Sequence, residues 1–196
     1  LYPDVPIVIG GIEASMRRLT HYDYWSDQLK PSILVDSKAD ILVYGMGEKQ
    51  ILAVAERLDA VGNRIEAERW EDLPQVAYLA KNNPAQHDTT ATQPLHNTAP
   101  QYTILHSHED AVKSKRAHAE NFRIIEIESN KIYPTTIVQP VGNQYVVINP
   151  PYPTMTTEEL DAIYALPFQY HPHPKYKDKH IPAYEMIRFS VCMHRG

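Results

Sequence analysis

The sequence contains very little cysteine. Cys192 is the only one among its 196 residues, which excludes a framework of internal disulfides and predicts a protein of a reducing compartment. Long apolar runs are also missing, since none approaches the roughly 20 residues that cross a bilayer. No basic N-terminal stretch leads into an apolar segment of the signal-peptide type. These absences predict a cytoplasmic protein without a membrane segment.

The chain also lacks an excess of positive charge. Its formal net charge is -5, so it offers no basic footprint for nucleic acid, and a nucleic-acid partner is not expected. Hydrophobic residues make up 43% of the sequence, which is enough to bury one sizeable core or two small ones. We therefore expect a protein of the α/β class.

Residues 1–80 alternate short apolar runs with helical patterns. "VPIVIGG" predicts a first strand and "IEASMRRLTHY" a helix that follows two glycines. A second strand is predicted over Ile41 to Tyr44, and a second helix over a segment that ends at Gly62. The apolar face of that helix is predicted to consist of Ile51, Val54, Ala55 and Leu58. This alternation is typical of strand-helix units with a parallel sheet, and predicts half of a Rossmann-like, doubly wound fold.

The rest of the chain divides into three further parts. Residues 81–101 are rich in Asn, Gln, Thr and Pro, which predicts a flexible loop. Residues 102–166 predict a small α+β subdomain with a strand "YTILHS", a helix over "SHEDAVKSKRAHAENF" capped by Ser107, and a hairpin that turns at Gly142-Asn143. Thr156 and Glu159 predict a capping box for a short helix. Residues 167–196 predict a Pro-rich connector followed by a strand.

Two glycine turns, "IGGIEAS" and "YGMGEKQ", follow predicted strands and precede predicted helices. Such turns can bind an anion through backbone N–H groups. Neither matches a dinucleotide fingerprint, because Gln50 occupies the place of the third glycine, and Glu13 and Glu48 would repel a phosphate. We therefore favour plain structural turns over a phosphate site.

A polar and aromatic cluster, "MRRLTHYDYWSD", follows the first turn. Aromatic side chains with polar ends serve either in a hydrogen-bonded structural knot or in the wall of a polar pocket, and both interpretations stay open, with the knot favoured. The candidate pocket takes in this cluster and the two acidic residues after the glycines: Glu13, Arg17, Arg18, His21, Tyr22, Asp23 and Glu48.

The histidines do not suggest a metal site. "HSH" and "HPHP" alternate on extended segments, and alternation does not bring several ligands to one point. The sequence therefore predicts no metal. Cys192, on a predicted strand, is expected to be a small buried hydrophobic residue.

Several blocks of the chain resemble, in order, the YgiQ-type family of radical S-adenosylmethionine (radical SAM) proteins. They are "VPIVIGGIEASMRRLTHYDYWSD", "SILVDSKADILVYGMGE", "INPP", "ALPF" and "HPHPKYKDKHIPAYEMIRFSVCMHRG". In that family the pair matching Arg195-Gly196 flanks the cluster loop, a cysteine triplet spaced CxxxCxxC. The resemblance implies a [4Fe-4S] cluster and S-adenosylmethionine for a longer parent protein, and no cofactor for this segment. It also implies that Ile187 to Met193 is the first strand of a radical SAM barrel that is missing here.

Residues 1–80 also look like the cobalamin-binding-like domain that precedes the barrel in several radical SAM families, although the signature Asp-x-His-x-x-Gly is absent. Two functions remain open. The segment is either the non-catalytic front of a radical SAM enzyme, helping to shape the substrate side of the barrel, or a docking module for a protein or RNA partner. The direction in which "MRRLTHYDYWSD" faces is expected to discriminate between them.

The predicted terminal strand also suggests partners. Without a barrel, the apolar face of Ile187, Phe189 and Val191 would be left uncovered on an unpaired edge. We expect this strand to pair with the rest of its own chain in the parent protein, and with a second copy about a two-fold axis in this segment alone.

Overall fold

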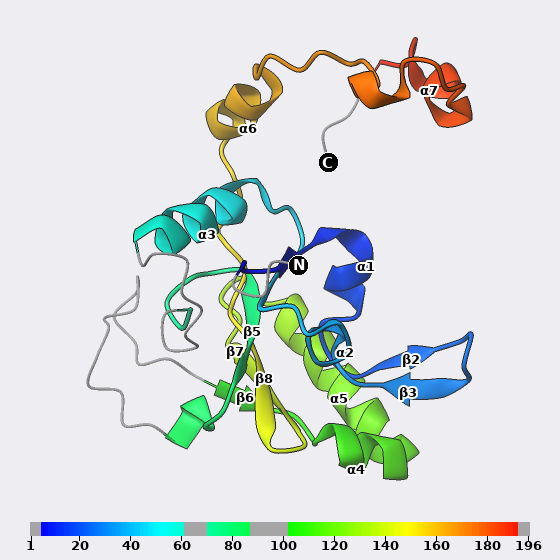
Figure 1. Cartoon of the computed structure of the whole chain (residues 1–196). Helices are drawn as coiled ribbons and strands as arrows, with labels where there is room; N and C mark the ends of the chain where they lie inside the picture. The colour runs from blue at the N-terminus through cyan, green and yellow to red at the C-terminus, as the bar shows by residue number, and fades with distance from the viewer. Residues whose placement is uncertain (1–4, 61–69, 87–101, 192–196) are drawn as a thin grey trace. The chain divides into compact units, whose positions relative to one another are not determined.

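The computed structural model describes residues 5–60, 70–86 and 102–191 (Figure 1). The chain divides into two compact units, Leu1–Pro153 and Thr154–Gly196. None of the helices in the described ranges is long and apolar enough to span a membrane.

A six-stranded sheet forms the centre of the first unit, with the strand order β1-β4-β5-β8-β7-β6. In that order the strands are Val8–Ile9, Ile41–Val43, Val76–Ala80, Gln144–Ile148, Thr136–Val141 and Tyr102–Ile104. The β1/β4 and β6/β7 pairs are parallel, whereas β4/β5, β5/β8 and β7/β8 are antiparallel. The α/β class is confirmed, but the prediction of a parallel sheet holds for only two pairs. An apolar strand sequence does not encode its direction, because either direction buries the same side chains.

The sequence predicted separate parts over residues 1–80 and 102–166, but strands from both parts lie in this one sheet. The structure therefore does not separate residues 102–166 as a subdomain, and its compact division falls after Pro153 instead of after Leu166. The reason is that β8 pairs with β5 along four residues of each strand, which joins the hairpin to the first half of the chain.

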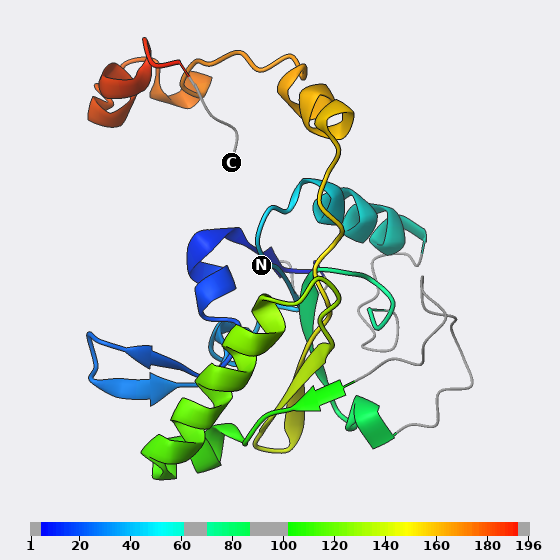
Figure 2. The same cartoon turned by 180° about the vertical axis from the view of Figure 1, so that it is seen from behind.

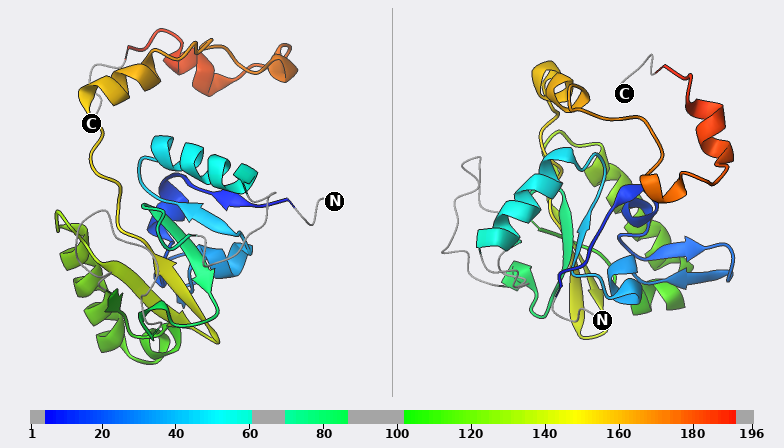
Figure 3. Two further views of the ribbon diagram at one scale, coloured as in Figure 1. Left: turned by 90° about the vertical axis from the view of Figure 1, so that its left-hand side faces the viewer. Right: turned by 45° about the horizontal axis from the view of Figure 1, so that its top comes forward.

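Helices cover both faces of the sheet, because alternate side chains of each strand point to opposite faces. Leu42 of β4 lies in one core with side chains of α1 (Gly11–Met16) and α2 (Ile33–Ser37). Two isoleucines of α5 (Lys115–Ser129) pack against this first core, and Figure 2 shows α5 in front of the strands. Ile41 and Val43 lie in a second core with Trp70 and with Val54 of α3 (Glu48–Ala60). In the left view of Figure 3, α3 lies apart from α5.

The helices that follow the two glycine turns both differ from the predicted ones. The helix after the first strand ends at Met16, because the chain turns there to bury Leu19 and Thr20. The chain then forms a hairpin of two antiparallel strands, β2 (His21–Asp23) and β3 (Gln28–Lys30). In α3 the buried residues are Gln50 and Val54, whereas Ile51 and Ala55 are exposed. The predicted stop at Gly62 lies outside the described residues.

The predicted helix after β6 is two helices, α4 (His108–Lys113) and α5. Ser107 caps α4 as predicted, with its side chain accepting from the N–H of Asp110. Ser114 ends α4 in an extended conformation and caps α5 by accepting from the N–H of Ala117. The break follows from the preference of serine for cap positions. The predicted hairpin turn is confirmed, since β7 and β8 flank Gly142-Asn143 and Gly142 has φ 59°.

Only the start of the predicted flexible loop is described. Residues 81–86 include a short 3-10 helix, η2 (Pro84–Gln86), in which Pro84 is buried. Residues 87–101 of that prediction lie outside the described residues.

The second unit contains α6 (Thr157–Tyr164), the 3-10 helix η3 (Pro174–Tyr176) and α7 (Pro182–Ile187). The capping box of Thr156 and Glu159 is present as predicted. The predicted strand is not observed over its described part: Ile187 ends α7, and Ser190 N–H bonds to the Ile187 carbonyl in a turn. Pro182 favours a helix start, and the described residues of this unit contain no strand with which the segment could pair.

Candidate functional site

Four chain segments meet at one edge of the sheet in the first unit. The parallel strands β1 and β4 both end there, so that Gly10 and the Tyr44–Gly47 turn are neighbours. The antiparallel strand β5 begins at this edge, just after Gln75, and β8 ends there, just before Asn149. We call this region the glycine-turn edge.

The helices that follow β1 and β4 leave this edge toward opposite faces of the sheet. Ala14 of α1 lies in the first core, whereas Val54 of α3 lies in the second. Where two neighbouring parallel strands send their helices to opposite faces, open α/β sheets bind ligands beyond the strand ends. The glycine-turn edge therefore has the topology of a ligand-binding edge.

The amide of Gln75 holds the second glycine turn in place. Its Nε2 donates to the carbonyl oxygens of Tyr44 at 2.7 Å and Met46 at 2.6 Å. Its Oε1 accepts from Gln50 Nε2 at 3.0 Å and from the N–H of Tyr152 at 3.1 Å. A single side chain thus connects the turn, the first turn of α3 and the segment after β8.

Tyr44 links the two sides of the edge. Its hydroxyl donates to the Asn149 carbonyl at 2.6 Å, and the Arg18 guanidinium lies 5.1 Å from its ring centre, a cation–π contact. Burial raises the pKa of the Tyr44 phenol and lowers the pKa of Arg18. Asn149 in turn donates from Nδ2 to the carbonyl of Leu73 at 2.8 Å and to that of Trp70. The "INPP" segment is thereby attached to the edge.

Three polar atoms in and beside this edge are buried and have no hydrogen-bond partner among the described residues: Arg18 Nε, Glu48 Oε2 and Gln50 Oε1. Buried polar atoms are nearly always paired in folded proteins, so unpaired ones mark places for water or for polar groups of a ligand. One is a donor on the α1 side, and two are acceptors in the first turn of α3.

The candidate pocket predicted from the sequence is not one site. Arg18 and Glu48 lie at or beside the glycine-turn edge. Arg17, His21 and Asp23 line a separate surface hollow of about 310 Å³ together with Lys30 and residues of α2. Glu13 pairs with Arg17 at 3.3 Å and is largely exposed. Arg195 and Gly196 lie outside the described residues.

The hollow carries charges of both signs. Arg17 and Lys30 contribute cations, and Asp23 and Asp36 contribute carboxylates. Hydrogen bonds from Ser26 lower the pKa of Asp23. His21 Nδ1 lies 3.1 Å from the Leu19 carbonyl, and because a carbonyl oxygen can only accept, Nδ1 is the donor. The balance of charge favours neither a simple anion nor a simple cation.

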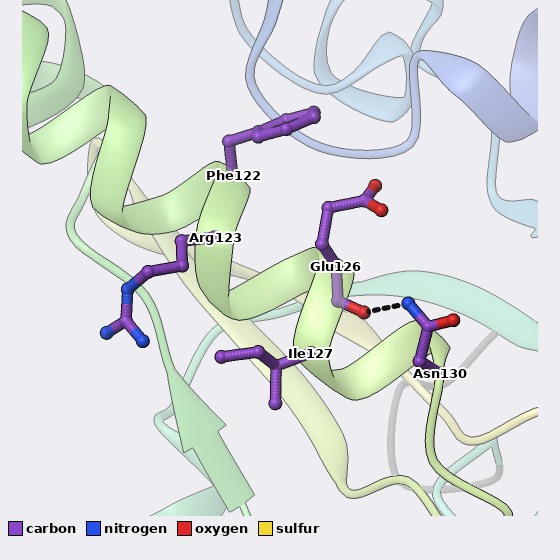
Figure 4. Close-up of a pocket in the computed structure, with 5 residues that line it drawn as sticks. All are labelled: Phe122, Arg123, Glu126, Ile127 and Asn130. Atoms are coloured by element: carbon purple, nitrogen blue, oxygen red, sulfur yellow. Dashed lines mark hydrogen bonds between the residues drawn. The ribbon is translucent and has the colours of Figure 1, made fainter.

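Figure 4 shows a second surface hollow, of about 550 Å³, on the outer face of α5. Its lining residues come from this one helix and its C-cap residue: Phe122, Arg123, Glu126, Ile127 and Asn130. Asn130 Nδ2 donates to the Glu126 carbonyl of the same helix at 2.7 Å. Since no second element contributes a polar group, this hollow does not have the converging contacts of a ligand site.

Several of the described histidines have hydrogen-bond partners, whereas His118 Nδ1 is buried and has none among the described residues. His106 Nε2 lies 2.8 Å from Glu120 Oε2, His108 Nδ1 lies 3.1 Å from Thr20 Oγ1, and His173 caps η3. Within residues 5–60, 70–86 and 102–191, no three His, Cys, Asp or Glu side chains are grouped so that they could hold a metal ion. His194 and Cys192 lie outside these ranges.

Sequence reasoning missed Gln75, Tyr44 and Asn149 as residues of the edge. Asn149 is part of the quoted "INPP" block, which was a usable signal. Gln75 has φ 62°, an uncommon conformation outside glycine. No local pattern marks it, because its partners lie 25 to 77 residues away in the chain.

Replacing Gly45 with alanine is expected to destabilise the first unit by about 1–2 kcal/mol, because Gly45 has φ 68° and a left-handed conformation is unfavourable with a Cβ. An added Cβ would also lie 3.3 Å from Gln75 Nε2. Urea unfolding measures the loss through the fluorescence of Trp70, in a Trp25→Phe background that leaves Trp70 as the only tryptophan.

Gly142→Ala is the matched control for this prediction. Gly142 has φ 59°, and a Cβ there would meet no atom within 4 Å, so only the conformational cost applies. Gly45→Ala should therefore be the more damaging change. Equal losses would contradict a tight contact between the turn and Gln75.

The chain was compared with known proteins. The family model described as Radical SAM N-terminal matches residues 1–190. A UPF0313 protein of Bacteroides thetaiotaomicron is 49% identical over 100% of this chain and 31% of its own length. A UPF0313 protein of Porphyromonas gingivalis is 46% identical over 100% of this chain and 29% of its own length. The UPF0313 protein YgiQ of Escherichia coli K12 is 37% identical over 100% of this chain and 32% of its own length. The chain thus spans about a third of the length of these curated relatives. No solved structure gave a significant match.

Proposed function

The chain belongs to the radical SAM N-terminal family, and we propose that it is the non-catalytic front segment of a radical SAM iron–sulfur enzyme, in which the glycine-turn edge helps to shape the substrate side of the catalytic barrel. Its similarity to the YgiQ-type family, expected from the sequence blocks, is confirmed.

One observation carries the proposed role of the edge. Three of the blocks that resemble the family, "VPIVIGGIEASMRRLTHYDYWSD", "SILVDSKADILVYGMGE" and "INPP", are separate in the chain but contribute neighbouring residues to this edge. Tyr44 of the second block bonds to Asn149 of the third, and the N–H of Gly45 in the second block donates to Ser15 Oγ of the first at 3.0 Å. Three buried polar atoms in and beside the edge have no partner among the described residues. An edge of this kind supports a role in contact with a ligand or a neighbouring domain.

The residues of this chain do not fit an iron–sulfur cluster. Cluster binding needs several cysteine thiolates, whereas the chain has only Cys192. In the proposed function the cluster and S-adenosylmethionine belong to the remainder of the longer polypeptide, and no catalytic step is assigned to this segment.

The proposal predicts that the full-length protein binds an iron–sulfur cluster and that the 196-residue chain binds none. After anaerobic reconstitution with iron and sulfide, the 196-residue chain should lack the visible absorption of a cluster. The full-length protein should bind a cluster and form 5′-deoxyadenosine from S-adenosylmethionine upon reduction. A stoichiometric cluster in the short chain, or none in the full-length protein, would contradict the proposal.

The position of the glycine-turn edge can be tested in the full-length protein with Cys192 replaced by serine. A spin label at Met46→Cys reports on the edge, and one at Val112→Cys reports on the opposite end of the sheet. The two sites are matched in exposure, at 56% and 55%. Pulsed EPR should give a stronger dipolar coupling to the reduced cluster for the label at Met46. Equal coupling, or a stronger one at Val112, would mean that the edge does not face the barrel.

A docking module is the second candidate function. The observation in its favour is the exposure of large aromatic side chains on the β2–β3 hairpin: Tyr22, Tyr24 and Trp25. The direction of the cluster "MRRLTHYDYWSD" was expected to discriminate between the two functions, but its residues point in two directions. Arg18 packs against Tyr44 beside the glycine-turn edge, whereas the three aromatic residues are exposed to solvent.

A further inference from the structure

The tip of the β2–β3 hairpin presents three aromatic side chains to solvent. Tyr22 is 56% exposed, Tyr24 67% and Trp25 80%. Figures 1 and 2 show the hairpin extending away from the sheet and its covering helices. Aromatic residues of this kind dominate the binding energy of protein interfaces, and contiguous exposed apolar surface commonly marks such interfaces.

The hairpin tip is held in one conformation although it is exposed. The Tyr22 hydroxyl donates to Asp27 Oδ1 at 2.6 Å, and Asp23 Oδ2 accepts from Ser26 Oγ at 2.6 Å. The rings of Tyr24 and Trp25 lie 4.9 Å apart. Asp27 has φ 53°, an unfavourable conformation that the surrounding contacts maintain. A surface ordered before binding loses less conformational entropy on association.

The base of the hairpin is anchored in the first unit. Thr20 donates its N–H to Gln139 Oε1 at 2.9 Å, and Leu19 is buried in the first core. On the other side, the N–H of Ile33 donates to the Arg17 carbonyl at 2.8 Å. Two strands of three residues each would be marginal by themselves, so these contacts make the hairpin a fixed projection from the sheet.

The charges at the tip limit the kind of partner. Asp23 and Asp27 lie beside the aromatic rings, and hydrogen bonds from Ser26 lower the pKa of Asp23, so that it is ionised at neutral pH. Phosphate backbones are repelled by carboxylates, so the tip of the hairpin does not favour a nucleic acid. An apolar recess with basic residues at its rim fits both the rings and the carboxylates.

We propose that the β2–β3 hairpin inserts Tyr24 and Trp25 into an apolar, basic-rimmed recess on the catalytic part of the same polypeptide. The inference rests on the proposed function, since it takes the chain as part of a longer enzyme. Its curated relatives have about two thirds of their length outside the matched region. That length provides a partner surface that is always present at high effective concentration.

Fluorine NMR of 5-fluorotryptophan tests the proposal. In the 196-residue chain, Trp25 should show a clear resonance shift between H2O and D2O, whereas Trp70, which is fully buried, should show none. The Trp25→Phe variant assigns the signal. In the full-length protein the Trp25 signal should lose most of this solvent shift, because the ring is then buried in the recess.

A substitution beside the reporter tests the contact itself. Tyr24→Ala in the full-length protein should move the docking equilibrium about 30-fold toward the open form, the size of an interface hot spot, and restore the solvent shift at Trp25. Ile132→Ala removes another exposed apolar side chain, 87% exposed, and should leave the Trp25 signal unchanged.

The outcomes separate this inference from the proposed function. A full-length protein that cleaves S-adenosylmethionine but leaves Trp25 as exposed as in the short chain overturns only the docking proposal. A buried Trp25 in a protein without a cluster overturns the proposed function and supports docking. Loss of the solvent shift in the short chain as its concentration rises, with a doubled mass in ultracentrifugation, would identify a second copy as the partner and overturn the proposal.

Discussion

Replacing Gln75 with alanine is expected to destabilise the first unit by about 3–5 kcal/mol. The change removes the side-chain donor to the Tyr44 and Met46 carbonyls of the second glycine turn. It also leaves Gln50 Nε2 and the Tyr152 N–H without their acceptor. Each buried polar group left unpaired costs about 1–3 kcal/mol. The four lost hydrogen bonds all involve one side chain and are therefore not independent. The total loss of unfolding free energy is for this reason smaller than four separate penalties of that size.

Three measurements complete this prediction. Urea unfolding followed by Trp70 fluorescence, in the Trp25→Phe background, gives the loss for Gln75→Ala. Gln28→Ala, at an exposed glutamine of β3, should change stability by less than about 0.5 kcal/mol. Gln75→Gly should be less damaging than Gln75→Ala, because glycine accepts the φ of 62° at this position. If Gln75→Ala behaved like Gln28→Ala, the glycine-turn edge would not depend on this amide.

Replacing Glu128 with alanine is expected to cost about 3 kcal/mol. Its side chain is only 6% exposed and connects the end of α5 to the start of β7. The carboxylate accepts from the Thr135 N–H at 3.0 Å, from Thr135 Oγ1 at 3.1 Å and from Lys131 Nζ at 2.5 Å. Removing a buried acceptor from the partly buried donors of Thr135 and from a paired cation is among the larger single-residue losses.

The Glu128 contribution should depend on pH. Burial by itself would raise the pKa of Glu128, but hydrogen bonds from Lys131 and Thr135 outweigh it and place the pKa below its ordinary value of 4.5. A carboxyl whose pKa is depressed in the folded protein stabilises it fully above the ordinary value. That contribution is lost as the pH falls through the lower, folded-state pKa.

The measurement is urea unfolding of the wild type and of Glu128→Gln, which keeps one acceptor and the shape of the side chain. The difference in unfolding free energy should be constant at neutral pH and shrink as the pH falls below 4.5. Glu126→Ala, at an exposed position of the same helix, is the control and should show little change. A difference that grew toward low pH would contradict the direction of the pKa shift.

Much of the local structure could be predicted because it depends on residues close in sequence. The capping box of Thr156 and Glu159, the Ser107 cap and the Gly142-Asn143 turn all form between residues within a few positions of each other. The two glycine turns after β1 and β4 were predicted for the same reason. The single helix predicted over residues 107–122 was wrong because the preference of Ser114 for a cap outweighed the helical pattern.

The terminal segment shows the limit of a local pattern. "IRFSVCM" is β-branched and apolar, which predicts a strand, but Ile187 ends a helix and the next four residues form no strand. A strand requires a partner for its backbone groups, and the described residues of the second unit contain no strand. The choice between helix and strand therefore depended on what lies beside the segment.

The sequence by itself determined the α/β class, several turns and caps, and, through its blocks, the family. Only the tertiary structure decided the strand order, the direction of β5 and the division of the predicted pocket into the glycine-turn edge and a separate hollow. Caps and turns arise from contacts a few residues apart, for which the sequence pattern is sufficient. The edge depends on pairs such as Tyr44 with Asn149, 105 residues apart, and such contacts exist only after the sheet has brought the segments together.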